Sequence, residues 1–310
     1  MNIMQFFKKF PNEETCREHF KMYRDRVGVI CKKCECKEHY WLSTINYYKC
    51  KKCGFRTSLK SGTVMENSKL PYQYWYMAFM FATSTKKSFS ALEIQRQLNH
   101  PFYEPIWAMM HKIRRIMCKA DNEYKLEDGI ELDEGYFTTN PPKDEEGNVI
   151  REEMKRGVGS PKHAKVLVMV ESKLNTEQTN IYKPNRSVRR LKMVHIEDYK
   201  HSTLETELRK AIDAKKTFVL TDDGRHYSKL KGLVKYHTPI NTKNIKSDKV
   251  LPWVHKTISN AKRLFLGVYH SFGREYTQNY LSEFCFKFNR RNYDNIFESL
   301  VISSVKYCWC

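Results

Sequence analysis

Apolar residues recur at helical spacing through residues 68–118, and this pattern predicts three short helices joined by brief connections. Ser90 stands where the N-cap of the second helix is expected, with Glu93 three residues later. Three helices in this order favour a helix-turn-helix-like unit, although any small helical bundle gives the same pattern.

The second half of the chain has the pattern of strands and helices in alternation. Strand-like alternation runs through 129–137 (GIELDEGYF) and 163–172 (HAKVLVMVES). Residues 216–223 (KTFVLTDD) form a continuous apolar run, which is typical of a central strand buried on both faces. An amphipathic stretch at 202–214 predicts a helix directly before it. Strand, strand, helix, strand predicts an α/β core with a mixed sheet.

Two pairs of cysteines predict a metal site near the N-terminus. Cys31 and Cys34 form one C-x-x-C pair, and Cys50 and Cys53 form another. Four thiolates at this spacing are typical of a structural Zn²⁺ site, whereas free thiols would leave the paired spacing unexplained. Cys36 is an extra cysteine beside the first pair, and His39 is a weaker substitute ligand. The aromatic and β-branched residues between the pairs predict a hairpin, and the whole unit is therefore predicted to be a zinc ribbon. Such a small unit is expected to need its metal to fold.

The charge of the chain changes what these elements are expected to bind. The 310 residues carry a formal net charge of +20. This favours a polyanionic partner over a merely solvated surface. The charge is uneven: residues 101–150 are net acidic, whereas both flanking regions are net basic. An acidic patch inside a basic protein suits a metal-dependent enzyme that acts on nucleic acid.

Two aspartates are the candidate ligands of a catalytic metal. Asp133 lies in the first predicted strand, and Asp222 lies at the end of the buried run. Carboxylates on neighbouring strands hold Mg²⁺ together with waters and substrate phosphates. Two such ions, roughly 3.5–4 Å apart, catalyse phosphoryl transfer. The alternative is that each aspartate is a turn or cap residue, because Asp-Gly is a common turn.

Taken together, these motifs resemble the DDE-type transposases of Merlin elements and their prokaryotic insertion-sequence relatives of the ISXO type. The resemblance runs from Cys31 to about Arg291. It rests on the zinc ribbon and on the stretches SGTVMENSKLPYQYW, SALEIQRQLNHPFYEPIWAMMHKIRR, ELDEGYF, TDDGRHY, WVHKTISNAKRLFLGVYH and YLSEFCFKFNRR.

The resemblance implies a ribonuclease-H-like catalytic domain of mixed α/β class behind an N-terminal DNA-binding region. It divides the chain into a zinc ribbon (1–60), a helix-turn-helix-like helical unit (61–125) and a DDE-type catalytic domain (126–310). Asp133 matches the first catalytic carboxylate of the family and Asp222 the second, with the choice between Asp222 and Asp223 left open.

The third catalytic position departs from the pattern of many relatives. His255 stands where they have glutamate, and Lys262 follows seven residues later on the same helix face. The resemblance suggests a subgroup trait rather than decay. His255 would be either a metal ligand or a contact to phosphate or water. As a ligand, its imidazole would suit Mn²⁺ better than Mg²⁺. Lys262 is expected to contact phosphate, and the further candidates for DNA binding are Arg263, Arg114 and Arg115.

The expected function is therefore that of a transposase. It would bind terminal inverted repeats and target DNA as a homodimer or larger assembly. Its cofactors would be structural Zn²⁺ and catalytic Mg²⁺ or Mn²⁺. Two alternatives stay open: a transposase-derived DNA-binding protein without catalysis, and a zinc-ribbon transcription regulator. No apolar run reaches the roughly 18–20 residues of a membrane span. The protein is therefore expected in the cytoplasm and nucleoid of a prokaryote, or in the nucleus of a eukaryote, rather than secreted.

Overall fold

The computed structural model describes residues 1–141, 162–176, 185–224, 232–241 and 250–309, together with residues 146, 150, 160, 227 and 230. The chain divides into two compact units, each described by itself below. The first unit is Met1–Ala120 with Arg291–Cys310, and the second is Asp121–Arg290. The C-terminal segment thus belongs with the N-terminal unit, which differs from the expected division at 60 and 125. Among the described residues, no helix is long and apolar enough to cross a membrane.

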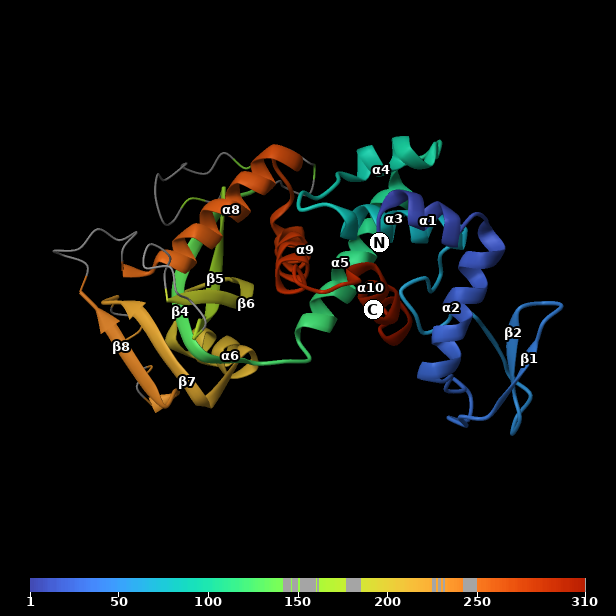
Figure 1. The fold of residues 1–310 in the computed structure, drawn as a ribbon, viewed down its shortest axis with the longest axis horizontal. Coiled ribbons are helices and arrows are strands. Elements are labelled where there is room, and N and C mark those ends of the chain that lie inside the picture. Colours follow the sequence, from blue (N-terminus) through green and yellow to red (C-terminus); the bar gives the residue numbers. More distant parts are fainter. Residues whose placement is uncertain are drawn as a thin grey trace. The chain divides into compact units, whose positions relative to one another are not determined.

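The first unit combines helices with a small sheet (Figure 1). Its strands β1, β2 and β3 pair antiparallel in that order, which confirms the hairpin expected between the cysteine pairs. The three helices expected in 68–118 are also present as α3, α4 and α5, and Ser90 caps α4 by accepting a hydrogen bond from the backbone N–H of Glu93 at 3.1 Å. The elements are α1 (Ile3–Lys9), α2 (Glu13–Val27), β1 (His39–Leu42), β2 (Tyr47–Cys50), β3 (Arg56–Ser58), α3 (Tyr72–Ser84), α4 (Ala91–Leu98), α5 (Tyr103–Asp121) and α10 (Ile296–Lys306).

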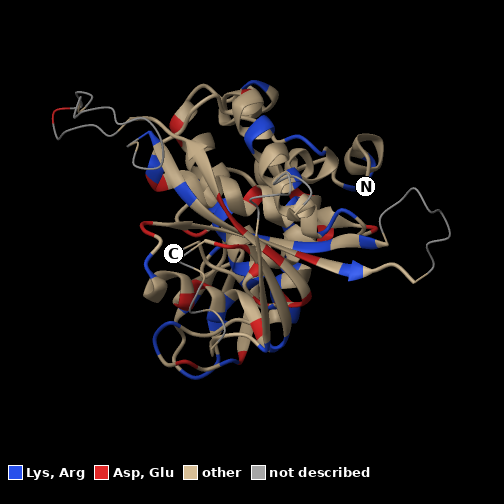
Figure 2. Ribbon diagram, turned by 90° about the vertical axis from the view of Figure 1, so that its left-hand side faces the viewer, with Lys and Arg blue, Asp and Glu red and all other residues tan. Residues whose placement is uncertain are grey.

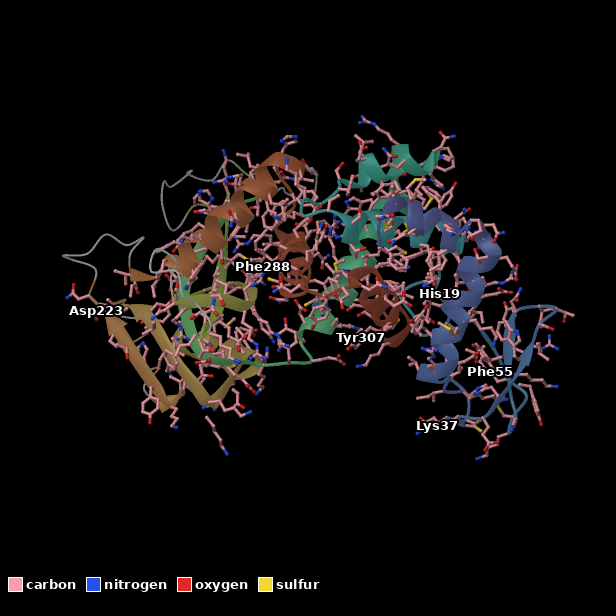
Figure 3. The ribbon with its side chains drawn as sticks, in the orientation of Figure 1. His19, Lys37, Phe55, Asp223, Phe288 and Tyr307 are labelled. Atoms are coloured by element: carbon pink, nitrogen blue, oxygen red, sulfur yellow. The ribbon has the colours of Figure 1, made fainter. Side chains whose placement is uncertain are left out.

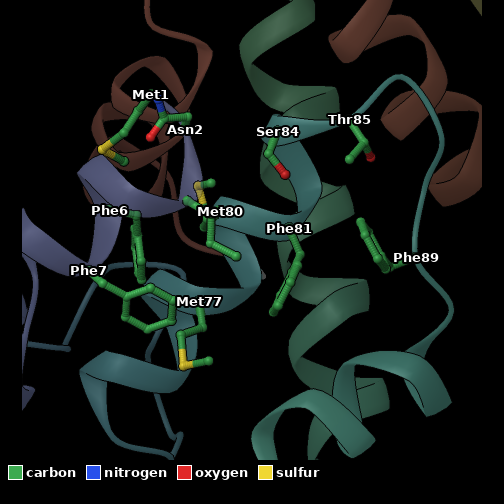
Figure 4. A pocket seen from close by; sticks show the side chains of 11 residues that line it. Met1, Asn2, Phe6, Phe7, Met77, Met80, Phe81, Ser84, Thr85 and Phe89 are labelled. Atoms are coloured by element: carbon green, nitrogen blue, oxygen red, sulfur yellow. The ribbon is translucent and has the colours of Figure 1, made fainter.

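Helix α10 explains why the end of the chain joins this unit. It packs against α2 and α3, and its Phe297 contacts the rings of Phe6, Phe10 and Tyr76 at centroid distances of 5.9, 5.6 and 5.9 Å. These side chains are all buried, so the C-terminal helix completes an aromatic core that the N-terminal helices begin. An apolar cavity of about 590 Å³ lies beside this core, lined mainly by α1 and α3 (Figure 4).

The second unit contains a five-stranded mixed sheet in the order β6-β5-β4-β7-β8. Strands β4, β5 and β6 are antiparallel neighbours, whereas β7 runs parallel to both β4 and β8. The elements are β4 (Leu126–Thr138), β5 (His163–Leu174), β6 (Arg186–Ile196), α6 (His201–Ala211), β7 (Ile212–Asp222), β8 (Tyr236–Ile240), α8 (Pro252–Val268), the short 3-10 helix η2 (Arg274–Tyr276) and α9 (Thr277–Asn289).

Helices cover both faces of this sheet. On one face, apolar residues such as Val166, Val168 and Val170 of β5 pack against α8 and α9. On the other face, residues such as Ile130 and Leu132 of β4 pack against α6. A mixed sheet flanked by helices is therefore confirmed, and it fits the ribonuclease-H-like architecture that the resemblance implied. One boundary differs from the expectation: α6 ends at Ala211 and β7 begins at Ile212, within the stretch expected to be helical.

Candidate active site

Four cysteine sulfurs converge beside the small sheet of the first unit. The sulfur atoms of Cys31, Cys34, Cys50 and Cys53 all lie within 4.8 Å of one another. The Cys34–Cys53 and Cys31–Cys53 sulfur distances are 3.3 and 3.6 Å. Four sulfurs bound at about 2.3 Å to a tetrahedral Zn²⁺ would be separated by about 3.8 Å. The cluster therefore has the donor set and the size of a structural zinc site.

The two alternative ligands lie outside this cluster. Cys36 directs its sulfur to the carbonyl oxygen of Glu38 at 3.8 Å. His39 places Nδ1 3.2 Å from the carbonyl oxygen of Lys37. Burial raises the pKa of the Cys50 thiol, but hydrogen bonds from the backbone N–H groups of Cys53 and Lys52 outweigh it and lower that pKa to about 6. For Cys34 the backbone N–H of Cys36 lowers the thiol pKa, but hydrogen bonds with the neighbouring sulfurs and burial outweigh it and raise that pKa to about 12. The thiolate that a metal requires is therefore favoured at Cys50 but not at Cys34 in the metal-free cluster.

The sheet of the second unit brings the two candidate aspartates together. Strands β4 and β7 pair in parallel with Glu131 opposite Leu220. Continuing that register by two residues sets Asp133 opposite Asp222, on strands that are about 4.8 Å apart. Side chains that are opposite each other in this register lie on the same face of the sheet. This is the face covered by α8, because Val168, which pairs with Asp133, belongs to the core cluster of that helix.

The same register distinguishes Asp222 from its neighbour. Asp222 is half-buried and accepts a hydrogen bond from the backbone N–H of Gly224 at 3.0 Å. Asp223 follows it and is exposed at the outer edge of the unit (Figure 3). Strand β7 ends at Asp222, so the register that sets Asp222 on the face of Asp133 does not extend to Asp223.

Helix α8 brings His255 to the same place. The Nδ1 atom of His255 lies 3.6 Å from Oδ2 of Asp133. The helix is held there by Glu131, which lies two residues before Asp133 on the same strand face. One oxygen of the buried Glu131 carboxylate accepts hydrogen bonds from the backbone N–H groups of Trp253 and Val254 at 2.8 and 2.9 Å. These N–H groups belong to the first turn of α8, where a helix offers no internal acceptors.

The environment of Asp133 makes its ionisation less favourable than in water. Burial raises the pKa of this carboxyl to about 6, and the nearby charges of Glu134 and Asp222 add to the effect. The backbone N–H of Glu134 and the imidazole of His255 oppose it. Two carboxylates that repel each other in a partly buried site form a natural place for a cation. The donors do not converge as tightly as the cysteines, which form the only described cluster of at least three donor atoms within 4.8 Å.

Helix α8 runs along β4 beyond Asp133. The ammonium of Lys262 lies 5.9 Å from the ring centre of Phe137, four residues past Asp133 on the strand. Between them, a Cβ atom added to Gly135 would lie 2.9 Å from the Phe137 ring and 3.5 Å from Ile258 of α8. Glycine at 135 therefore allows the close approach of the helix. Lys262 and Arg263 are both exposed.

One of the arginines predicted to contact DNA is buried. Arg114 is only 1% exposed, because α5 turns this residue into the core of the first unit, so its guanidinium is not displayed at the surface. Arg115 is exposed on the same helix, and its guanidinium lies 5.7 Å from the ring centre of Trp309. Helical spacing alone did not separate the buried arginine from its exposed neighbour.

Two positioning residues, Glu131 and Tyr227, were not predicted from the sequence. Glu131 holds α8 as described above. Tyr227, which follows β7, donates a hydrogen bond through its hydroxyl to the Glu134 carboxylate on the opposite face of β4. This bond ties the segment after Asp222 to the strand that carries Asp133. The only sequence signal was the period of two that places Glu131 on the face of Asp133.

Residues 125–289 match the family model of the ISXO2-like transposase domain. The chain belongs to this transposase family. The match spans more than half of the chain and covers all strands of the mixed sheet, from β4 to β8, together with α8 and α9. Asp133, Asp222, His255 and Lys262 all lie within the matched region. No curated protein matches the chain.

Solved structures of Mos1 transposase are similar to this transposase at a low level. The pre-cleavage Mos1 transpososome has 11% identity over 75% of this chain and 78% of that chain, with a TM-score of 0.28. The Mos1 paired-end complex with the left transposon end has 12% identity over 78% and 82%, with a TM-score of 0.27. Similarity at these TM-scores supports no conclusion about this chain.

Proposed function

We propose that this transposase binds duplex DNA at terminal inverted repeats and catalyses metal-dependent cleavage and strand transfer. The observation that carries the proposal is the strand register that sets Asp133 opposite Asp222, with the imidazole of His255 3.6 Å from Asp133. Three polar side chains from separate segments of a transposase-family domain thus gather on one face of its sheet.

Asp133 and Asp222 would hold Mg²⁺ or Mn²⁺, because carboxylate oxygens are the ligands that these ions prefer. When bound, the ions activate a nucleophile and stabilise the leaving oxygen of a phosphodiester. His255 brings no fixed negative charge, so the site has two formal charges rather than three. The imidazole either completes the metal site as a neutral ligand or, when protonated, contacts phosphate.

The residues of α8 and β4 orient the substrate. Lys262 lies two helical turns beyond His255 and is free to contact a phosphate next to the scissile bond. Arg263 is a further exposed cation beside it. Glu131 keeps the first turn of α8 against the strand of Asp133, so His255 stays in place while DNA binds. No side chain needs to form a covalent intermediate with DNA.

The first unit would supply DNA binding. Its zinc ribbon and its α3–α5 helices, in a helix-turn-helix-like role, would hold the terminal repeat, and Arg115 is an exposed candidate contact. Lysine and arginine are distributed over the chain (Figure 2), whose net charge of +20 favours a polyanion. Two element ends must be processed together, so we expect a homodimer or larger assembly on terminal-repeat and target DNA.

The test is end cleavage of duplex DNA that carries the inverted repeats flanking the coding region. The parent protein should cleave in the presence of Mg²⁺ or Mn²⁺, and Asp133→Ala should abolish cleavage while still binding the duplex. Glu127→Ala is the matched control, because Glu127 lies on the same strand but forms an ion pair at the surface with Lys216. If the parent binds the repeats but never cleaves, the protein is a DNA-binding relative without catalysis.

A further inference from the structure

The small sheet of the first unit has one packed face and one open face. On the packed face, the Tyr48 hydroxyl donates a hydrogen bond to Asp25 of α2 at 2.6 Å. The ammonium of Lys21, also in α2, lies 4.7 Å from the ring centre of Trp41. These contacts fix the orientation of the sheet against α2, so the side chains of the other face are directed to solvent.

The open face carries a row of side chains that crosses all three strands. Tyr40 of β1 pairs with Lys49 of β2, and Lys49 pairs with Arg56 of β3. Directly opposite residues of antiparallel strands place their Cβ atoms about 4.5–5.5 Å apart, so these three side chains stand next to one another. All three are exposed, and Tyr40 is 59% exposed.

The second row of this face is neutral. Leu42, Tyr47 and Ser58 are opposite one another there, so neither row of the three strands contains an acidic side chain. Neither Lys49 nor Arg56 forms an ion pair with any residue that the structure describes. The Lys51 ammonium lies 5.3 Å from the ring centre of Tyr40, but it forms an ion pair with Glu38 at 3.3 Å and so adds no net charge to the row. Phe55 and Lys37 also lie on this outlying part of the unit (Figure 3).

We propose that the Tyr40–Lys49–Arg56 row is a binding site for the phosphodiester backbone of duplex DNA. Lysine and arginine neutralise phosphates, and a tyrosine hydroxyl donates a hydrogen bond to a phosphate oxygen. A partner with dense negative charge complements two rows that have two unpaired cations and no carboxylate, since the nearby Glu38 is neutralised by Lys51. The inference rests on the proposed function, since it assigns the contact surface of the ribbon to the DNA that the transposase cleaves.

The size of the effect follows from counterion release. Each phosphate that a lysine or arginine neutralises contributes about 0.9 to the slope of log affinity against log salt. The double variant Lys49→Ala/Arg56→Ala should therefore lower that slope by about 1.8. If the ionic contribution vanishes near 1 M salt, the same relation predicts about 30-fold weaker binding at about 0.15 M. Tyr40→Ala should weaken binding without changing the slope, because it removes no charge.

The experiment is a titration of the full-length, zinc-loaded protein with a short fluorescein-labelled duplex of random sequence, followed by fluorescence anisotropy at several salt concentrations. Arg209→Ala/Lys210→Ala is the matched control, because it removes the same charge from two exposed residues of α6 that pair with glutamates. Zinc content and circular dichroism establish that every variant is folded. An unchanged zinc content is expected, because no ligand is altered.

The inference is supported if Lys49→Ala/Arg56→Ala lowers both the affinity for DNA and its salt dependence, while Arg209→Ala/Lys210→Ala changes neither. It is overturned if the two double variants bind alike. In that case the proposed function is unaffected, because the end-cleavage assay tests it separately. If the parent does not bind the duplex at all, both the inference and the proposed function fail.

Discussion

Replacing Glu131 should release the first turn of α8 and with it His255. In Glu131→Ala, the backbone N–H groups of Trp253 and Val254 lose their shared acceptor, and Val254 is fully buried. An unsatisfied buried donor costs about 1–3 kcal/mol, and lost helix caps cost about 0.5–2 kcal/mol. Because water can hydrate the backbone N–H of Trp253 in part, we expect the free energy of unfolding to fall by about 3 kcal/mol in total.

The assay is thermal unfolding of the metal-free protein, with hydrogen exchange read at residues 252–256. A loss of about 3 kcal/mol in a domain of this size lowers Tm by about 6–12 °C. Glu131→Gln should be milder, about 1 kcal/mol, because both hydrogen bonds go to a single oxygen that the amide retains. Glu127→Ala is the control, since a surface ion pair contributes about 0–1 kcal/mol. A Glu131→Ala protein as stable as this control, with unchanged exchange in α8, would refute the reasoning.

Three further predictions concern the metal sites. The pKa of Asp133 is raised in the folded state to about 6, so the folded state loses stability as the pH rises from about 4 to about 6, and the full penalty remains at higher pH. Asp133→Asn should therefore stabilise the metal-free protein by up to about 3 kcal/mol at pH 8, and the gain should vanish below about pH 4 in a chemical denaturation series. If His255 ligates the catalytic ion, cleavage rates with Mn²⁺ should at least equal those with Mg²⁺, and a strict preference for Mg²⁺ would argue against direct ligation. Cys50→Ser should lose zinc, measured as metal per chain by mass spectrometry, whereas Cys36→Ser should retain it; equal loss from both would place Cys36 in the site.

The cysteine spacing and the strand patterns were sufficient to predict much of this molecule. Two C-x-x-C pairs can reach one ion only if the intervening hairpin forms, so the spacing alone was enough to assign Cys31 and Cys53 to the same metal site. The apolar run before Asp222 similarly required a central strand, and β7 lies between β4 and β8.

Other features depend on contacts between distant segments, which the pattern of one segment does not contain. The role of Glu131 arises only when α8, more than 100 residues later, reaches β4. The burial of Arg114 arises because α5 packs into its unit by the face that carries it. The membership of α10 in the first unit depends on its packing with α2 and α3, which no local signal of the last residues specifies.

The central claim is that Asp133 and Asp222 share a divalent cation. The most direct test is anomalous diffraction from crystals of this transposase soaked in Mn²⁺, with an Asp222→Asn crystal as the control. The account predicts an anomalous peak in contact with both carboxylates in the parent and its loss in the variant. A peak that touches neither aspartate, or no peak on this face of the sheet at saturating Mn²⁺, would contradict it.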